Sequence, residues 1–123
     1  MTTIATAFQI IIALGIVNVW VLRRNRATAF RPEGAGTLSE EFERYGLPNW
    51  MRVAVGTAKL VLAGLLIIGI FFAQTALAAS ALMSLMMAAA IAAHVRVGDP
   101  AVKSAPAFLM FAMSLFVVVA YAA

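Results

Sequence analysis

Hydrophobic residues in this chain are gathered into four long runs separated by short polar segments. We place the runs at residues 3–22, 50–72, 75–95 and 104–121 of the 123-residue sequence. Each run matches the ~20 residues that an α-helix needs to cross ~30 Å of hydrocarbon. Strands of a membrane barrel do not fit, because the runs are continuous and do not alternate with a period of two. The pattern predicts an all-α, integral membrane four-helix bundle.

Composition supports a membrane protein over a soluble one. Hydrophobic residues make up 64% of the chain and charged residues 11%. A soluble domain of this length would expose much of that apolar surface and aggregate. We therefore treat residues 1–123 as a single transmembrane domain. The chain has no cysteine, which excludes disulfides, thiolate metal sites and dithiol redox chemistry carried by the chain itself.

The basic residues indicate an orientation in the membrane. They lie in or beside two loops, at Arg23, Arg24, Arg26, Arg31, Arg44, Arg52, Arg96 and Lys103. The positive-inside rule then makes both loops cytoplasmic and puts both termini outside. The first run precedes its arginines, whereas a signal peptide carries its positive charge before the apolar run, so we keep it as a span. The same placement favours lipid over nucleic acid as the reason for the net charge of +4.

The first cytoplasmic loop, residues 23–49, contains a candidate helix. Residues 37–40 read Thr-Leu-Ser-Glu, which fits a capping box at a helix start. Leu38, Phe42 and Tyr45 follow at spacings of four and three on one face, and a glycine comes next, which can end a helix. We predict a short amphipathic helix that lies in the interface or folds back over the bundle. The alternative is a solvated connector in which the pattern is fortuitous.

Lys59 is the residue that stands out in the apolar runs. A charge at the centre of a membrane helix costs at least ~2.5–3.5 kcal/mol, which something must offset. Either the long side chain reaches the interface, or it joins a buried polar cluster or ligand site. The candidate hydrogen-bond partners are Asn18 and Ser114, at a similar depth, and His94, which lies somewhat closer to the cytoplasmic face. Such a cluster suits an anionic head group or a quinone carbonyl, and would equally hold the helices in register.

Three further polar residues belong to the proposed interfacial loops: Tyr45, Arg96 and Asp99. His94 is the only histidine in the sequence, so we assign it no metal site. Its simplest role is an interfacial cap, with proton transfer or ligand contact as alternatives. Asp99 precedes Pro100 and is expected to cap the following helix, while pairing with Arg96 is a second option. No residue is assigned to catalysis.

Glycine and tryptophan positions complete the expected packing. Gly56, Gly64 and Gly69 are expected to permit close approach between helices in lipid. Trp20 and Trp50 lie near the cytoplasmic ends of their runs, where tryptophan commonly anchors a helix at the membrane surface.

Three passages together resemble a known family. Residues 45–50 read Tyr-Gly-Leu-Pro-Asn-Trp, residues 56–60 read Gly-Thr-Ala-Lys-Leu, and residues 94–100 read His-Val-Arg-Val-Gly-Asp-Pro. In this order and spacing they resemble the DoxX-like family of small four-span bacterial membrane proteins, over roughly residues 4–120. The resemblance implies a four-helix membrane bundle. Because some relatives are linked to thiosulfate:quinone oxidoreduction and others to complexes that handle oxidative stress, it also makes quinone a candidate cofactor.

Three functions remain open from the sequence. The favoured one is an accessory or binding subunit of a membrane complex, which holds a quinone, lipid or other hydrophobic ligand near Lys59 or docks a protein partner through residues 31–49. The second is a membrane oxidoreductase subunit that uses the redox centre of a partner. The third is a small-molecule or proton transporter, for which four spans require a homo-oligomer. A self-sufficient enzyme is not favoured.

Overall fold

The computed structural model describes residues 2–22 and 36–122 of the chain, and within them every regular element is helical. The elements are α1 (Thr2–Val17), the π-helical turn η1 (Asn18–Leu22), α2 (Leu38–Arg44), α3 (Asn49–Ile68), α4 (Ala73–Arg96), the 3₁₀ turn η2 (Ala101–Ser104) and α5 (Ala105–Ala122). The predicted all-α class is confirmed.

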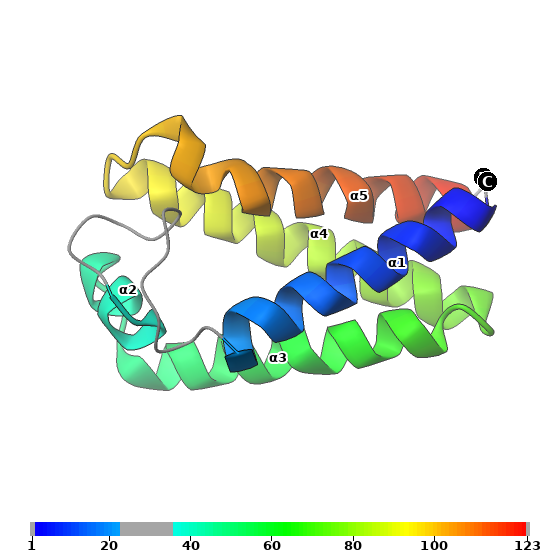
Figure 1. Ribbon diagram of the computed structural model, residues 1–123, viewed down its shortest axis with the longest axis horizontal. Helices are drawn as coiled ribbons and strands as arrows, with labels where there is room; N and C mark the ends of the chain where they lie inside the picture. Colours follow the sequence, from blue (N-terminus) through cyan, green and yellow to red (C-terminus); the bar gives the residue numbers. More distant parts are fainter. Residues whose placement is uncertain (1, 23–35, 123) are drawn as a thin grey trace.

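The long helices α1, α3, α4 and α5 form an antiparallel bundle (Figure 1). Both ends of the chain and the α3–α4 turn lie at one end of it, and α2 and η2 lie at the other. Within the described residues, four segments are long and apolar enough to cross a membrane: Thr3–Leu22, Asn49–Ile68, Ala73–Arg96 and Ala101–Ala122. The predicted membrane-spanning bundle is therefore confirmed in architecture.

The second span is shorter than its apolar run. α3 ends at Ile68, because a tight turn over residues 69–72 reverses the chain into α4. A Cβ on Gly69 would lie 2.7 Å from the Cα of Ala76, so only glycine permits this approach. Gly64 differs from the expectation, because nothing lies within 4 Å of its Cβ position and it makes no close helix approach.

The predicted helix in the first loop is present as α2. The Thr37 hydroxyl accepts a hydrogen bond of 3.1 Å from the Glu40 amide, which caps the first turn. At the other end Gly46 adopts a φ of 75°, and the next amide, of Leu47, bonds back to the Phe42 carbonyl at 2.9 Å. This is a Schellman ending, in which glycine takes the left-handed conformation that other residues resist.

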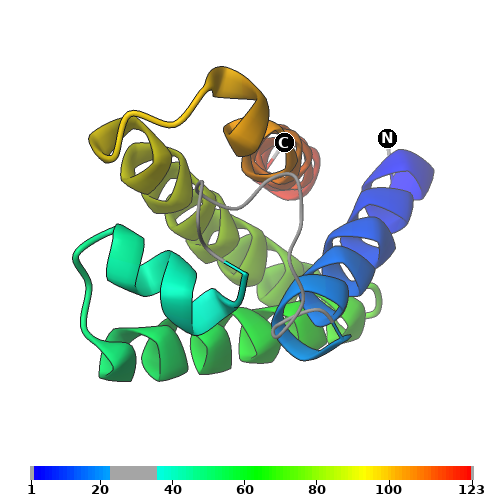
Figure 2. The same cartoon turned by 60° about the vertical axis from the view of Figure 1, so that its left-hand side comes forward.

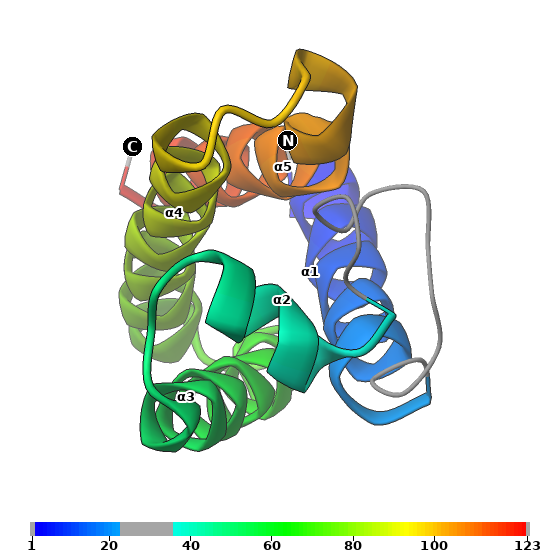
Figure 3. The ribbon, with the colours of Figure 1, turned by 90° about the vertical axis from the view of Figure 1, so that its left-hand side faces the viewer.

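α2 folds over the end of the bundle (Figures 2 and 3). Its apolar residues Leu38, Phe42 and Tyr45 are buried, as the spacing predicted. Phe42 packs edge-to-face on Trp20, with ring centroids 5.9 Å apart. α2 therefore closes the space that α1, α3 and α4 surround at this end, and the alternative of a solvated connector is wrong for its described part.

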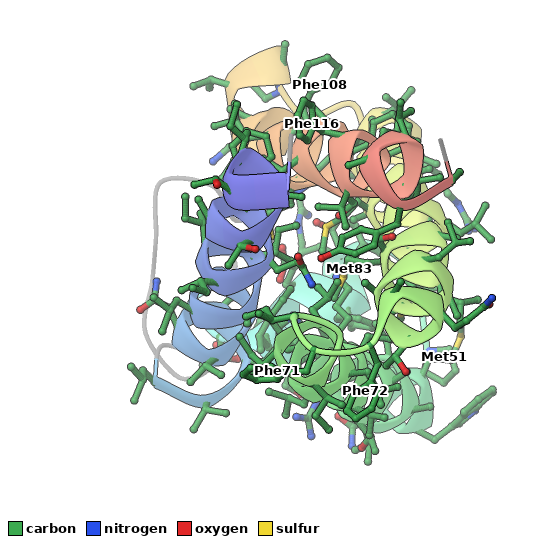
Figure 4. The ribbon with its side chains drawn as sticks, turned by 90° about the vertical axis from the view of Figure 1, so that its right-hand side faces the viewer. Met51, Phe71, Phe72, Met83, Phe108 and Phe116 are labelled. Carbon is green, nitrogen blue, oxygen red and sulfur yellow. The ribbon has the colours of Figure 1, made fainter. Side chains whose placement is uncertain are left out.

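The interior of the bundle is apolar along most of its length. Figure 4 looks from the end that carries the termini and shows Met83 pointing inward, with Phe71 and Phe72 at the near turn. Ile12, Leu66 and Met83 are fully buried there. The buried polar residues among those described are Gln9, Lys59, Ser80, Ser84, His94 and Ser114. Two of them, Lys59 and His94, lie toward the end that α2 covers.

Candidate functional site: a cavity beneath α2

The end of α4 brings an aspartate back onto a histidine. Gly98 adopts a φ of 74°, and the Asp99 amide bonds to the His94 carbonyl at 3.0 Å, which is again a Schellman ending. This turn folds the chain over the last turn of α4. As a result, Asp99 Oδ2 lies 2.6 Å from His94 Nδ1, a short charge-assisted contact, and both side chains are largely buried.

Two expectations for Asp99 are therefore wrong. The residue that caps η2 is Pro100, without a side-chain hydrogen bond, because the Asp99 carboxylate is turned toward α4. Pairing with Arg96 is likewise not formed among the described residues, since Arg96 lies on the exposed side of the α4 terminus.

Tyr45 joins α2 to the same histidine. Its hydroxyl oxygen lies 3.2 Å from His94 Nε2, and it donates a hydrogen bond of 3.0 Å to Glu41 Oε1. The tyrosine and histidine rings meet edge-to-face at 5.5 Å. Burial raises the pKa of Tyr45 well above its ordinary value, and the negative charge of Glu41 raises it further. The hydroxyl therefore keeps its proton, and Glu41, Tyr45, His94 and Asp99 form one continuous polar chain.

Lys59 approaches this chain from α3. Its side chain is only 8% exposed, so it lies inside the bundle rather than along its surface. The ammonium nitrogen is 5.2 Å from the centre of the Trp20 ring, within range of a cation–π interaction. This contact offsets part of the cost of a charge at membrane depth.

Trp20 is not the interfacial anchor that its position suggested. The side chain is 9% exposed, whereas that of Trp50 is 69% exposed. Trp20 turns inward on the π-helical turn η1 and packs on Gly56, where a Cβ would lie 2.6 Å from the indole ring. Gly56 thus makes the expected close approach, and its role is to admit the indole beneath Lys59.

These groups surround a cavity of about 620 Å³. The volume lies within the range usual for small-molecule sites, ~300–1,000 Å³. Its walls come from α1, η1, α2, α3, α4, η2 and α5, so every element of the described chain contributes. Most of the lining is apolar and includes Ile16, Val19, Phe42, Met86, Met87 and Met110. The polar lining consists of Asn18, Glu41, Tyr45, Lys59, His94 and Lys103.

The structure therefore brings together most of the polar residues singled out in the sequence. Lys59, Asn18 and His94 line the same cavity, and Tyr45 belongs with them rather than in a separate loop. Ser114 is different: it does not line the cavity, and its buried Oγ has no hydrogen-bond partner in the described part of the chain. The expected hydrogen bond between Ser114 and Lys59 is thus not formed.

Sequence reasoning missed Glu41 and Lys103 as members of this site. Glu41 was not considered as a site residue, yet it lines the cavity. Its position four residues before Tyr45 was the available signal, because residues at that spacing are neighbours on a helix. Lys103 had no comparable signal, since only the turn after α4 directs η2 toward the cavity.

The chemistry available is that of a binding site with exchangeable protons. The chamber is mostly apolar, and one part of its wall carries the Lys59 ammonium, the Tyr45 phenol and the His94 imidazole. Tyr45 is hydrogen-bonded to the Glu41 carboxylate, and His94 to the Asp99 carboxylate. The phenol and the imidazole are in contact with each other. Within residues 2–22 and 36–122, no group of three or more His, Cys, Asp or Glu side chains is arranged to hold a metal ion. Donors and acceptors of this kind recognise the polar head of a hydrophobic molecule.

Comparison with known proteins agrees with the resemblance seen in the sequence. Residues 30–118 match the model of the DoxX-like family. No match was found among curated proteins or among solved structures.

Proposed function

The chain belongs to the DoxX-like family, and from that premise we propose that it is a binding subunit of a membrane complex, holding a hydrophobic molecule of the quinone class beneath α2. The observation that carries this proposal is the cavity itself. Lys59, Tyr45 and His94 converge on one side of a chamber of about 620 Å³ whose remaining walls are largely apolar.

The shape of the site suits an amphipathic ligand. An isoprenoid or acyl tail is accommodated by the methionine and alanine side chains of α4 and the apolar face of α1. Because the bundle lies in lipid, a ligand of this kind partitions into the medium that surrounds the protein. A molecule without an apolar tail would leave the larger, apolar part of these walls uncovered.

The head group of the ligand is expected beside Lys59. The carbonyl oxygens of a quinone accept hydrogen bonds, and a lysine ammonium is a strong donor with three hydrogens. The Lys59 nitrogen lies 5.2 Å from the centre of the Trp20 ring, and this contact leaves N–H donors for a ligand. The Tyr45 hydroxyl and His94 imidazole lie on the same cavity wall and are the further polar contacts available to a ring oxygen.

The same proposal assigns the protein to a bacterial inner membrane, with the α2 end in the cytoplasm and both termini outside. Support comes from α2, the end of α4 and η2, which lie at one end of the bundle and carry Arg44, Arg96 and Lys103, whereas the α3–α4 turn at the other end has no charged side chain. The lipid bilayer is thus the surrounding partner, and the cavity lies toward the cytoplasmic side.

A protein partner is expected at the outer face of α2. Glu40, Glu43 and Arg44 are exposed there, on the side away from the cavity. Residues 31–35 of the proposed docking segment lie outside the described residues. If the complex is an oxidoreductase, we assign the redox centre to that partner, because this chain has no cysteine and only one histidine to ligate one. A second copy of the chain is the other partner to be sought in the same preparation.

Ligand binding can be read from a single tryptophan. Trp50 is exposed and does not line the cavity, and Trp50→Phe leaves Trp20 as the only indole. We expect a short-chain ubiquinone to quench Trp20 fluorescence saturably in detergent or nanodiscs. Lys59→Met should weaken binding roughly ten- to hundredfold, the range for losing a hydrogen bond to a charged group.

Matched variants decide whether the cavity is the site. Ser114→Ala alters a buried polar residue outside the cavity and should leave the affinity unchanged. Ala90→Phe fills the cavity from α4 and should abolish saturable quenching. Equal quenching in the wild type and in Ala90→Phe would overturn the proposal. If oleate suppresses the ubiquinone quenching and a second quinone does not, the cavity is assigned to lipid instead.

A further inference from the structure

Helices α1 and α5 lie side by side over only part of their length. Near the chain termini, the Phe8 and Phe116 rings pack edge-to-face with their centroids 5.2 Å apart. Toward the α2 end the two helices diverge, because α1 runs obliquely across the bundle to α3 (Figures 1 and 3). There Trp20 packs on Gly56 of α3, and among the described elements η1 makes no extensive contact with α5 or η2.

A methionine joins α1 and α5 at the edge of the cavity. Met110 of α5 lies against Gly15 of α1, and a Cβ on Gly15 would collide with the methyl group of that side chain. Both residues line the cavity. Since methionine is unbranched and has three rotatable bonds, its tip can move aside with little strain. Met110 therefore forms an adjustable edge of the cavity between the two helices.

The cavity reaches the surface of the protein beside η1. Asn18 lines the cavity and is also exposed, and Ala107 lines it from the first turn of α5. The two residues belong to the segments Thr3–Leu22 and Ala101–Ala122, which are long and apolar enough to cross a membrane. An opening at this position therefore lies at membrane depth, where lipid surrounds the helices.

The sides of the cavity are not covered equally. α2 lies across the α3 side, whereas no described helix lies between η1 and the start of α5 (Figure 3). Ala89 of α4 is a second cavity residue that is exposed, so α4 is the competing place for an opening. The divergence of α1 from α5 favours the side of η1 and α5.

Lys59 lies across the bundle from this side. α3 and α5 each pack on α1 and on α4, so they occupy opposite corners of the bundle (Figure 3). A head group beside Lys59 therefore points the rest of the ligand toward α5. A cavity of about 620 Å³ holds a drug-sized molecule, whereas a long isoprenoid chain exceeds it and needs a way out.

We infer that the cavity opens sideways to lipid between η1 and α5, with Met110 at its edge, and that its ligand is a long-tailed molecule whose tail leaves through this opening. The inference rests on the proposed quinone-class head group and adds that the tail passes Met110 and Ala107 into the bilayer. Long-tailed molecules are thereby selected over tail-less ones, because only they also cover the apolar walls at the opening.

Tail length tests this assignment. With Trp50→Phe as the background, quenching of Trp20 in nanodiscs gives the dissociation constants of a ubiquinone without an isoprenoid tail and of one with a long tail. Ala107→Phe places a ring at the opening and should raise the constant of the long-tailed molecule about tenfold relative to that of the tail-less one. Ala112→Phe, at an exposed position of α5 that does not line the cavity, is the matched control and should leave the ratio unchanged.

A second measurement needs no quinone. Phospholipids with brominated acyl chains quench a tryptophan that they touch, and Trp20 is a cavity residue with only 9% exposure. In nanodiscs of such lipid, Ala107→Phe should remove most of this quenching, and Ala112→Phe should leave it unchanged. Met110→Ala shortens the side chain over Gly15 and should increase the quenching, which tests the opening even if the bulkier variant does not fold.

The outcomes separate this inference from the proposed function. Unchanged quenching in both Ala107→Phe and Met110→Ala overturns the inference, and so does an unchanged ratio of the two dissociation constants in Ala107→Phe. Losses confined to Ala89→Phe also overturn it, because they place the opening on α4. If neither ubiquinone quenches Trp20, the proposed function fails, while the brominated lipids still decide whether the cavity opens between η1 and α5.

Discussion

The Gln9 side-chain amide donates a hydrogen bond of 2.8 Å to the Leu66 carbonyl, and so joins α1 to the last turn of α3. The helical donor for that carbonyl, the amide of Ile70, bonds instead to Ile67 where the helix ends. Gln9 is fully buried, and its amide oxygen Oε1 accepts a hydrogen bond of 3.2 Å from the Tyr121 hydroxyl. In these apolar surroundings water cannot serve the Leu66 carbonyl, so Gln9 supplies the hydrogen bond that caps the end of α3.

Replacing Gln9 with leucine should therefore destabilise the bundle. The substitution keeps the side chain large but leaves the Leu66 carbonyl without its donor, at a cost of about 1–2 kcal/mol in the free energy of unfolding. Thermal or denaturant unfolding in detergent measures the change. Ser114→Ala is the control, because its Oγ has no hydrogen-bond partner among the described residues and its removal should cost nothing. Equal stability of Gln9→Leu and the wild type would contradict the capping role.

Gly56 and Gly64 lie on the same helix and should respond oppositely to alanine. A methyl group on Gly56 would strike the Trp20 ring at 2.6 Å, so Gly56→Ala should cost about 1–3 kcal/mol and displace the indole from Lys59. Gly64→Ala meets nothing within 4 Å and should be neutral or slightly stabilising, since alanine favours the helix. In the Trp50→Phe background, the Trp20 emission should shift only in the first variant; a shift in both would be inconsistent with this packing.

The alkaline titration of Tyr45 provides a test of its burial. Burial and the Glu41 charge raise its pKa, so the contribution of Tyr45 to α2 docking is fully present below the ordinary tyrosine pKa of ~10 and is lost as the pH climbs above it. The chain has two tyrosines, and Tyr121→Phe leaves Tyr45 alone. We expect its tyrosinate absorbance to appear well above that of free tyrosine. Ionisation together with free tyrosine would mean that α2 is not docked in solution.

Orientation in the membrane can be measured with two engineered thiols. Gln74 is exposed at the α3–α4 turn, and Arg44 is exposed at the end of α2. In intact spheroplasts an impermeant maleimide should label Gln74→Cys and should reach Arg44→Cys only after lysis, as the distribution of basic residues requires. The reverse labelling pattern would invert the proposed topology while leaving the fold untouched.

The candidate site was only partly predictable, and the reasons differ from residue to residue. Lys59 was identified because a charge in an apolar run is conspicuous in any fold. Tyr45 was found as an apolar-face residue of α2, but its contact with His94 joins positions 49 residues apart. Glu41 was not identified, because a seven-residue helix has too few turns for its pattern to show which side chains face the bundle. Gln9 was not predicted, because the Leu66 carbonyl that it caps is next to it only in the folded structure.

The sequence by itself determined the four spans, their order and the amphipathic α2, because apolar length, glycine turns and helix caps act through neighbouring residues. Tertiary structure alone decided that Trp20 turns inward beneath Lys59 and that Asp99 turns back onto His94. The reason is physical: these contacts depend on how two backbones approach each other, at Gly56 and at the Gly98 turn, and on the cavity that the helices leave between them.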